Sequence, residues 1–135
     1  MSTPIASCDT AIRVRYAETD RMGYLHHSMY PVYFEQGRTE LLRQQGISYR
    51  DIEDQGFFLA VVKLEIRFRR PAYFDDLLRL RTTLTRTTAV RVEHRYELFR
   101  DNDLLCEATS TLACVDAEGR LQALPDSLQR REASA

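Results

Sequence analysis

Hydrophobic and polar residues alternate along most of the chain, but one segment nearer the N-terminus repeats its apolar residues at helical spacing instead. Ile12, Val14 and Tyr16 alternate with Arg13 and Arg15, which is the period of a strand with one buried face. The same alternation predicts further strands over about 57–69, 77–87, 89–100 and 104–115. Short polar turns separate these later strands, so neighbours along the chain are expected to pair in antiparallel fashion.

The segment 30–45 is expected to form the main helix. Its apolar face recurs at i, i+3, i+4, i+7 and i+11, at Tyr30, Tyr33, Phe34, Gly37 and Leu41. Pro31 suits the first turn of a helix, and Gly46 suits its C-terminal cap. Gly37 costs about 1 kcal/mol of helix propensity in the middle of this face, so we expect it to let the helix approach a sheet closely. A short second helix is expected over 49–55.

The order of the expected elements is β-α-β-β-β-β, which indicates an α+β fold. The one long amphipathic helix needs the sheet to cover its apolar face, so the sheet is expected to wrap around a central helix. We expect residues 10–126 to form a single domain, with residues 1–9 and 127–135 as flexible termini.

Composition and charge narrow the function classes. The formal net charge is -1 with acids and bases interspersed, so a nucleic acid is not an expected partner. No apolar run is long enough to span a bilayer, and the N-terminus does not resemble a signal peptide. Cys8, Cys106 and Cys114 contain no C-x-x-C pair, which favours reduced thiols and a cytoplasmic location. Cys106 and Cys114 are expected to pack as small hydrophobic side chains.

Several motifs resemble the 4-hydroxybenzoyl-CoA thioesterase family, most closely its YbgC-like branch of acyl-CoA thioesterases. The resemblance rests on the segments Arg15–Tyr30, Phe34–Arg43, Arg69–Ala72, Asp75–Leu77 and Ala123–Pro125. It implies a hot-dog fold, in which a curved antiparallel five-stranded sheet wraps around one long central helix. It also implies a homodimer whose two sheets join, or a homotetramer of two such dimers, with active sites at the subunit interface.

The same resemblance assigns roles to individual residues. Asp20 matches the catalytic aspartate that ends the family's Tyr-x-x-x-Asp element, and Tyr16 matches the tyrosine of that element. His27 and Tyr30 match the family's His-x-x-Tyr element. The implied reaction is hydrolysis of an acyl-CoA to a free acid and coenzyme A, which enters only as part of the substrate, without a further cofactor or a metal.

Thioester hydrolysis needs a base or a nucleophile, and hydrogen-bond donors for the oxyanion that develops at the carbonyl. Asp20 suits either of the first two roles, and the residues leave both open. Backbone N–H groups around His27 and Ser28, at the start of the helix, are expected to point at the thioester oxygen, with Tyr30 nearby. The plain alternative is that Asp20 is a turn residue.

The neighbouring candidates each have a structural alternative. His26 and His27 are adjacent in an expected extended segment and should point in opposite directions, so at most one should face the site, and we favour His27 as an orienting group. Tyr16 is expected to pack beside Ile12 and Val14, with its hydroxyl near the loop as the functional alternative. His94 is interpreted as a packed core histidine.

Charged side chains give two more hypotheses. Arg67, Arg69 and Arg70 form either a solvated strand face or a site for the phosphates of CoA. Glu35 and Arg38 lie one helical turn apart, and the simplest interpretation is an ion pair within the helix, with contact with the site as the functional alternative.

Two other functions remain as alternatives. One is hydration or dehydration of an enoyl thioester on the same fold, which loss of the enoyl chromophore without thiol release would reveal. The other is a non-catalytic module that binds acyl-CoA without turnover. An acyl carrier protein thioester is an alternative acyl donor for the hydrolase.

Overall fold

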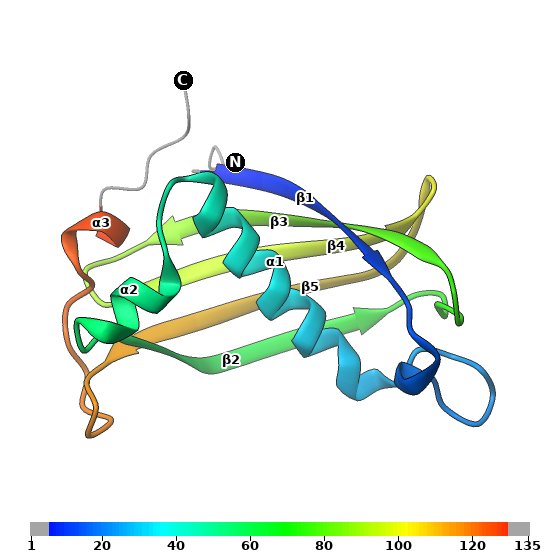
Figure 1. Cartoon of the computed structure of the whole chain (residues 1–135), viewed down its shortest axis with the longest axis horizontal. Coiled ribbons are helices and arrows are strands. Elements are labelled where there is room, and N and C mark those ends of the chain that lie inside the picture. The colour runs from blue at the N-terminus through cyan, green and yellow to red at the C-terminus, as the bar shows by residue number, and fades with distance from the viewer. Residues whose placement is uncertain (1–5, 130–135) are drawn as a thin grey trace.

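The antiparallel sheet predicted from the alternating segments is present in the structure, a computed structural model that describes residues 6–129. Its strand order is β1-β3-β4-β5-β2, and every neighbouring pair is antiparallel (Figure 1). The strands are β1 (Ala6–Arg13), β2 (Phe58–Phe68), β3 (Leu77–Thr87), β4 (Arg91–Arg100) and β5 (Asp103–Val115). The helices are α1 (Tyr30–Gln44), α2 (Tyr49–Asp54) and α3 (Asp126–Gln129), with short 3₁₀ helices η1 (Tyr16–Glu18) and η2 (His27–Met29).

Helix α1 lies across one face of the sheet, and Gly37 allows the contact (Figure 1). A Cβ atom at this position would lie 2.2 Å from Thr82 Oγ1 and 2.8 Å from Leu80 Cδ2. Both side chains belong to β3 and are fully buried, so a larger residue would force the helix and strand apart. The predicted close approach of the helix at Gly37 is confirmed.

The predicted elements differ from the structure mainly at the first strand. Strand β1 begins at Ala6 and pairs with β3 along its length, so residues 6–9 are not the loose segment that composition indicated. It also ends at Arg13, and Tyr16 belongs to η1 instead of the strand. At the other end of the chain, residues 127–129 belong to α3 and Leu128 is fully buried, so they are not part of a loose terminus either. Residues 1–5 and 130–135 lie outside the described residues, and the prediction that they are flexible stays a prediction. None of the helices in the described part of the chain is long and apolar enough to cross a membrane.

The core contains two clusters of buried side chains beneath α1. One surrounds Tyr30 and Phe34 in the first half of the helix, and the other surrounds Leu41 in the second half together with Ile52 of α2. Cys106 and Cys114 are buried, as predicted. His94 and Tyr96, on β4, and Ser110, on β5, bring polar atoms into this interior.

Candidate active site

The loop between β1 and α1 carries most of the predicted site residues. It runs through η1, a tight turn and η2 at one end of the sheet, next to the C-terminal end of β2 (Figure 1). Two bridges hold it in place: Thr19 pairs with Leu25 inside the loop, and Tyr24 pairs with Tyr73 before β3. The loop is therefore fixed to the sheet.

A buried carboxylate, Glu18, supports this loop from inside. Its Oε1 accepts hydrogen bonds from the Arg15 backbone N–H at 2.8 Å and from the Tyr33 hydroxyl at 2.8 Å. Its backbone carbonyl accepts a hydrogen bond from His26 N–H at 2.9 Å. Burial alone would raise the pKa of Glu18, but the hydrogen bonds from Arg15 and Tyr33 and the Arg15 guanidinium outweigh it and lower the pKa below its ordinary value. Glu18 is therefore a charged residue that connects Tyr33 of α1 with Arg15 before the Asp20 turn and His26 after it.

Asp20 starts the tight turn and is held by it. Its Oδ1 accepts hydrogen bonds from Met22 N–H at 2.9 Å and Tyr24 N–H at 3.0 Å. Gly23 has φ of 82°, the left-handed conformation that glycine adopts without a Cβ penalty. Oδ2 accepts no hydrogen bond from residues 6–129. Asp20 therefore stabilises its own turn, and this structural role uses only one of its two carboxylate oxygens.

Asp20 also lines a cavity of about 310 Å³ between the loop, the start of α1 and the segment after β2. The cavity has aromatic and basic walls. Its lining comprises Asp20, Tyr24, Leu25, His27, Tyr30, Phe68, Arg69, Arg70 and Pro71. The structure thus brings Asp20, His27 and Tyr30 together with two of the three predicted arginines.

The two adjacent histidines do not point apart, contrary to the prediction. Their rings stack at 4.3 Å between centroids, because the chain enters the 3₁₀ turn η2 instead of continuing as an extended strand. The ring of His26 caps η2: its Nδ1 accepts a hydrogen bond from Ser28 N–H at 3.1 Å. His27 is the one of the pair that lines the cavity, as predicted.

This capping changes the candidate oxyanion donors. Ser28 N–H is already used by His26, and so the amide of Ser28 is not available as predicted. The amide of His27 precedes the first hydrogen bond of η2 and has no partner among the described residues.

Tyr30 forms the buried wall of the cavity. Its ring meets that of Phe68 edge to face, with 4.8 Å between centroids and 87° between planes. Burial, reinforced by the nearby Cys106 thiol, raises the pKa of Tyr30 to about 12. Tyr30 is therefore a neutral phenol at physiological pH, and it presents a donor instead of a negative charge.

The three predicted arginines separate into two groups. Arg69 and Arg70 follow β2 and line the Asp20 cavity, whereas Arg67 lies on the strand outside it. Arg69 forms a 2.7 Å ion pair with Glu107, and Arg70 lies 3.7 Å from an oxygen of Asp103. The hydrogen bond from Arg69 lowers the pKa of Glu107, so this carboxylate remains charged beside the cavity mouth.

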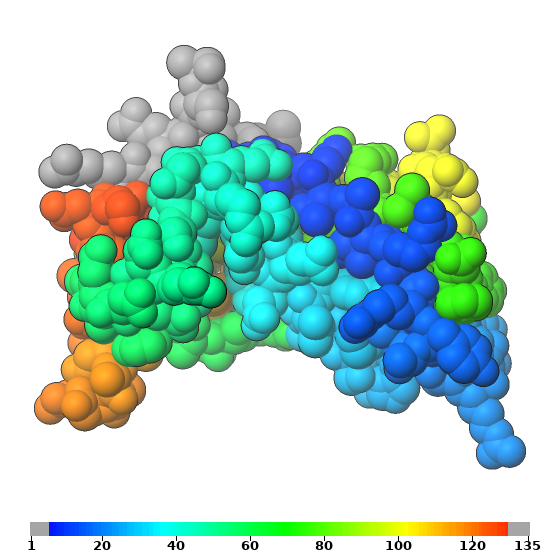
Figure 2. All heavy atoms as spheres, in the orientation of Figure 1, coloured from blue at the N-terminus to red at the C-terminus, as the bar shows by residue number. Residues whose placement is uncertain are grey.

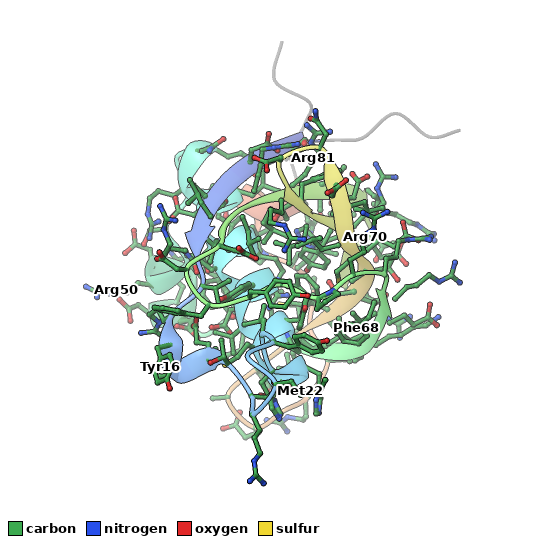
Figure 3. The ribbon with its side chains drawn as sticks, turned by 90° about the vertical axis from the view of Figure 1, so that its right-hand side faces the viewer. Tyr16, Met22, Arg50, Phe68, Arg70 and Arg81 are labelled. Atoms are coloured by element: carbon green, nitrogen blue, oxygen red, sulfur yellow. The ribbon has the colours of Figure 1, made fainter. Side chains whose placement is uncertain are left out.

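Two further predictions from the sequence are wrong. Tyr16 does not pack beside Ile12 and Val14: it is 76% exposed and contacts Phe74. Figure 3 shows Tyr16 and Phe68 on opposite sides of this end of the molecule, and Tyr16 is not part of the cavity lining. The chain leaves the strand at Arg13 and turns into η1, which rotates the side chain of residue 16 outwards.

The second wrong prediction concerns helix α1. Glu35 and Arg38 form no ion pair in the described structure, since the Arg38 guanidinium donates to the Tyr96 hydroxyl at 3.0 Å instead.

Among the described residues, no group of three or more His, Cys, Asp or Glu side chains is placed to hold a metal ion.

Glu18 is the supporting residue that the sequence interpretation missed. Its only local signal is the spacing to Arg15, three residues earlier, at the start of a helical turn. The decisive contact is with Tyr33, which lies 15 residues away in sequence. A contact between residues this far apart leaves no local pattern in the sequence from which it could be predicted.

Comparison with protein families gives one match across most of the chain. A family model described as the thioesterase-like superfamily matches residues 14–131. The match covers the loop that carries Asp20, all of α1 and the strands that line the cavity.

Individual relatives agree with this match. A Haemophilus influenzae protein named acyl-CoA thioesterase YbgC is 33% identical over 106 residues, covering 78% of this chain and 78% of that protein. An Escherichia coli O6:H1 protein named acyl-CoA thioester hydrolase YbgC is 30% identical over 119 residues, covering 87% of this chain and 89% of that protein. The crystal structure of the hypothetical protein TT1821 from Thermus thermophilus superposes with a TM-score of 0.87 and 37% identity, covering 93% of this chain and 94% of that one.

Proposed function

The chain belongs to the thioesterase-like superfamily, and from this premise we propose that it hydrolyses the thioester of an acyl-CoA to a carboxylic acid and free coenzyme A. The observation that carries the proposal is the half-anchored carboxylate of Asp20. One oxygen is fixed by two backbone amides, while the other lacks a partner among the described residues and the side chain lines a cavity. Relatives that share at least 30% identity are named for this reaction.

In the proposed chemistry, Asp20 acts through its free Oδ2. As a base, it takes a proton from water while the water oxygen attacks the thioester carbonyl; the C–S bond then breaks, and the proton passes from Asp20 to the CoA thiolate. As a nucleophile, Oδ2 attacks the carbonyl itself and the CoA thiolate leaves; water then hydrolyses the resulting mixed anhydride, which supplies the proton for the thiolate and regenerates the Asp20 carboxylate. Both routes end in a carboxylic acid and a thiol, and both require the carboxylate to be held in position. The hydrogen bonds to Oδ1 supply that orientation.

We propose that the His27 amide and the cavity-facing side chains polarise the carbonyl. A free N–H at the start of a helical turn is a suitable donor for an oxyanion. The Tyr30 phenol stays protonated because its pKa is raised to about 12, so the wall next to the reacting atoms carries no competing negative charge. The His27 imidazole, at the cavity surface, orients water or the thioester.

Arg69 and Arg70 are the proposed contacts for the phosphates of CoA. Both are partly exposed, at 44% and 63%, at the mouth of the cavity, where an extended ligand would leave it. Guanidinium groups bind phosphate oxygens through paired N–H donors. Phosphates would compete with Glu107 and Asp103 for these arginines, so the contribution of each is expected to be modest. An acyl carrier protein thioester presents a phosphopantetheine arm and is the alternative substrate.

We propose that the active form is a homodimer, or a homotetramer of two such dimers, joined along β2. This strand lies at one edge of the sheet and leaves a row of backbone N–H and C=O groups unpaired. Val61, Val62 and Phe68 are about half exposed along it, and Val32 is similarly exposed on the adjacent face of α1. A second copy paired with β2 would cover these side chains and place its own residues beside Phe68, which lines the Asp20 cavity. We propose a cytoplasmic location, which the free cysteines Cys8, Cys106 and Cys114 favour.

The Asp20→Asn variant tests the proposal. The amide oxygen of asparagine can still accept the two hydrogen bonds at Oδ1, so the turn should survive, whereas the proton-accepting and nucleophilic oxygen is lost. We expect kcat for thiol release from an acyl-CoA to fall at least ~100-fold, with an unchanged circular dichroism spectrum and similar substrate binding. A panel of short, long and aromatic acyl-CoAs identifies the substrate to be used. Retention of more than about a tenth of the wild-type kcat would return Asp20 to a turn role only.

A further inference from the structure

A second cavity, of about 450 Å³, lies between the second half of α1, helix α2 and the sheet. Figure 2 shows the surface hollowed between α2 and α1 at this place. Its lining residues include Arg38, Tyr49, Leu59 and His94, and it shares none with the Asp20 cavity. The function proposed above makes no use of it.

The floor of this cavity is polar at His94, where a hydrophobic core is expected, and two further buried polar side chains adjoin His94. His94, Tyr96 and Ser110 lie on the helix-facing side of β4 and β5, and all three are at most 3% exposed. The Tyr96 hydroxyl lies 2.6 Å from Ser110 Oγ, and the rings of His94 and Tyr96 stack at 6.1 Å between centroids. These residues lie where the two hydrophobic clusters meet. Burial of polar groups costs stability relative to apolar packing, so a polar floor beside a cavity indicates a role in binding.

Arg38 supplies a positive charge above this floor. Its guanidinium donates to the Tyr96 hydroxyl at 3.0 Å, and it forms no ion pair with a carboxylate in the described structure. The side chain is half buried, and its remaining N–H donors border the cavity. A guanidinium in this setting favours an anion with two oxygen acceptors.

The acidic residues at the same cavity restrict which anion fits. Glu35 and Glu53 are exposed and line its outer part, whereas Arg38 lies deeper. Exposed carboxylates are screened by water and salt, so they weaken the field inside the cavity without cancelling it. They disfavour a doubly charged phosphate more than a singly charged group. Leu42, Leu59 and Leu112 provide apolar surface for a short hydrocarbon or aromatic body.

We propose that this cavity binds the carboxylate of a small organic acid, with the carboxylate on Arg38 and the apolar body against the leucines. The ligand is either a free acid, such as the product of the reaction proposed above, or a carboxylate carried by the acyl group of a thioester substrate. The carboxylate-binding site itself is independent of the chemistry at Asp20.

Calorimetric titration of the wild-type protein with hexanoate and benzoate tests the site. Hexanol and benzyl alcohol serve as neutral counterparts, and inorganic phosphate as the more highly charged anion. We expect saturable binding of the carboxylates at concentrations up to about 10 mM, and weaker binding of the alcohols and phosphate. Arg38→Gln should weaken carboxylate binding at least about tenfold. Arg43→Gln, a change of an exposed arginine on the same helix that does not line this cavity, should leave it unchanged.

Tyr96→Phe provides a second variant in case Arg38→Gln does not fold. It keeps the stacking on Phe34, at 4.4 Å between centroids, and removes only the hydroxyl that positions Arg38. It should also weaken carboxylate binding. Absence of saturable binding to the wild type, or equal affinity in all the variants, would overturn the proposal.

Competition distinguishes the two sources of the carboxylate. In the wild type, hexanoate that binds equally well with and without saturating S-(5-carboxypentyl)-CoA, a thioether that carries a terminal carboxylate and has no thioester to hydrolyse, identifies a separate site for free acids. Displacement of hexanoate by this analogue but not by S-hexyl-CoA, which lacks the carboxylate, identifies a site occupied by the carboxylate of the acyl group. Because binding is measured without turnover, failure of the thioesterase proposal would leave this result interpretable.

Discussion

Replacing Glu18 by alanine is expected to destabilise the fold and to disturb the Asp20 loop, whereas replacing it by glutamine should do little of either. Glutamine keeps an oxygen in the place of Oε1, which accepts from both the Arg15 amide and the Tyr33 hydroxyl. Alanine removes this acceptor. The comparison therefore separates the hydrogen bonds of Glu18 from its charge.

The magnitude follows from the burial of each partner. The Tyr33 hydroxyl is buried, and leaving such a donor unsatisfied costs about 1–3 kcal/mol. The Arg15 amide adds about 1 kcal/mol, since water can replace Glu18 there only in part. The ion pair with the Arg15 guanidinium, which is 74% exposed, contributes less than about 1 kcal/mol. We therefore expect Glu18→Ala to lower the free energy of unfolding by about 2–4 kcal/mol, and Glu18→Gln by about 1 kcal/mol or less.

Urea unfolding followed by circular dichroism, at one fixed protein concentration, measures these differences. A double-mutant cycle with Tyr33→Phe tests the assigned contact. The Glu18→Ala change leaves the Tyr33 hydroxyl without an acceptor, and Tyr33→Phe removes that hydroxyl. The coupling energy should be at least about 1 kcal/mol. Glu18→Ala should also lower kcat for thiol release at least about tenfold, whereas Glu18→Gln should keep most of the wild-type kcat.

The pH dependence of Glu18 gives an independent check. The folded-state pKa of Glu18 lies below its ordinary value, so its carboxylate contributes stability above the pKa of the unfolded chain. That contribution is lost as the pH falls through the folded-state pKa. The advantage of wild type over Glu18→Gln should therefore shrink on acidification. An alanine variant within about 0.5 kcal/mol of wild type, or strict additivity with Tyr33→Phe, would refute the assigned role.

Further predictions concern packing, the CoA contacts and assembly. Gly37→Ala should lower the free energy of unfolding by about 1–2 kcal/mol, because the cost of overpacking against Thr82 exceeds the gain in helix propensity. Thermal unfolding should show a smaller loss of stability for the same change in a Thr82→Ala background. Joint replacement of Arg69 and Arg70 by glutamine should raise KM for acyl-CoA more than it lowers kcat in steady-state assays, while Arg67→Gln changes neither, and an unchanged KM would remove the pair from the site. Sedimentation should show a dimer or tetramer at micromolar concentration, and a stable, active monomer would contradict pairing along β2.

The loop before α1 shows how far local patterns reach. The motif around Asp20 indicated a turn and a candidate catalytic residue, and the structure contains both because the carboxylate caps its own turn through nearby amides. The prediction for Tyr16 failed because alternation was extended past the end of the strand. Where the period of two gives way to a 3₁₀ turn, the direction of each side chain is set by contacts that are distant in sequence, such as Glu18 with Tyr33.

The sequence by itself determined the strands, the main helix and the close approach at Gly37, because periodicity and backbone preference act over a few neighbouring residues. β3 and α2 lie where the pattern placed them, to within a residue. Only the tertiary structure decided that Arg69 and Arg70 line the Asp20 cavity while Arg67 does not. It also decided that Arg38 binds Tyr96 instead of Glu35. Those contacts join separate elements, and the free energy that selects them comes from burial and from satisfying polar groups across the whole sheet.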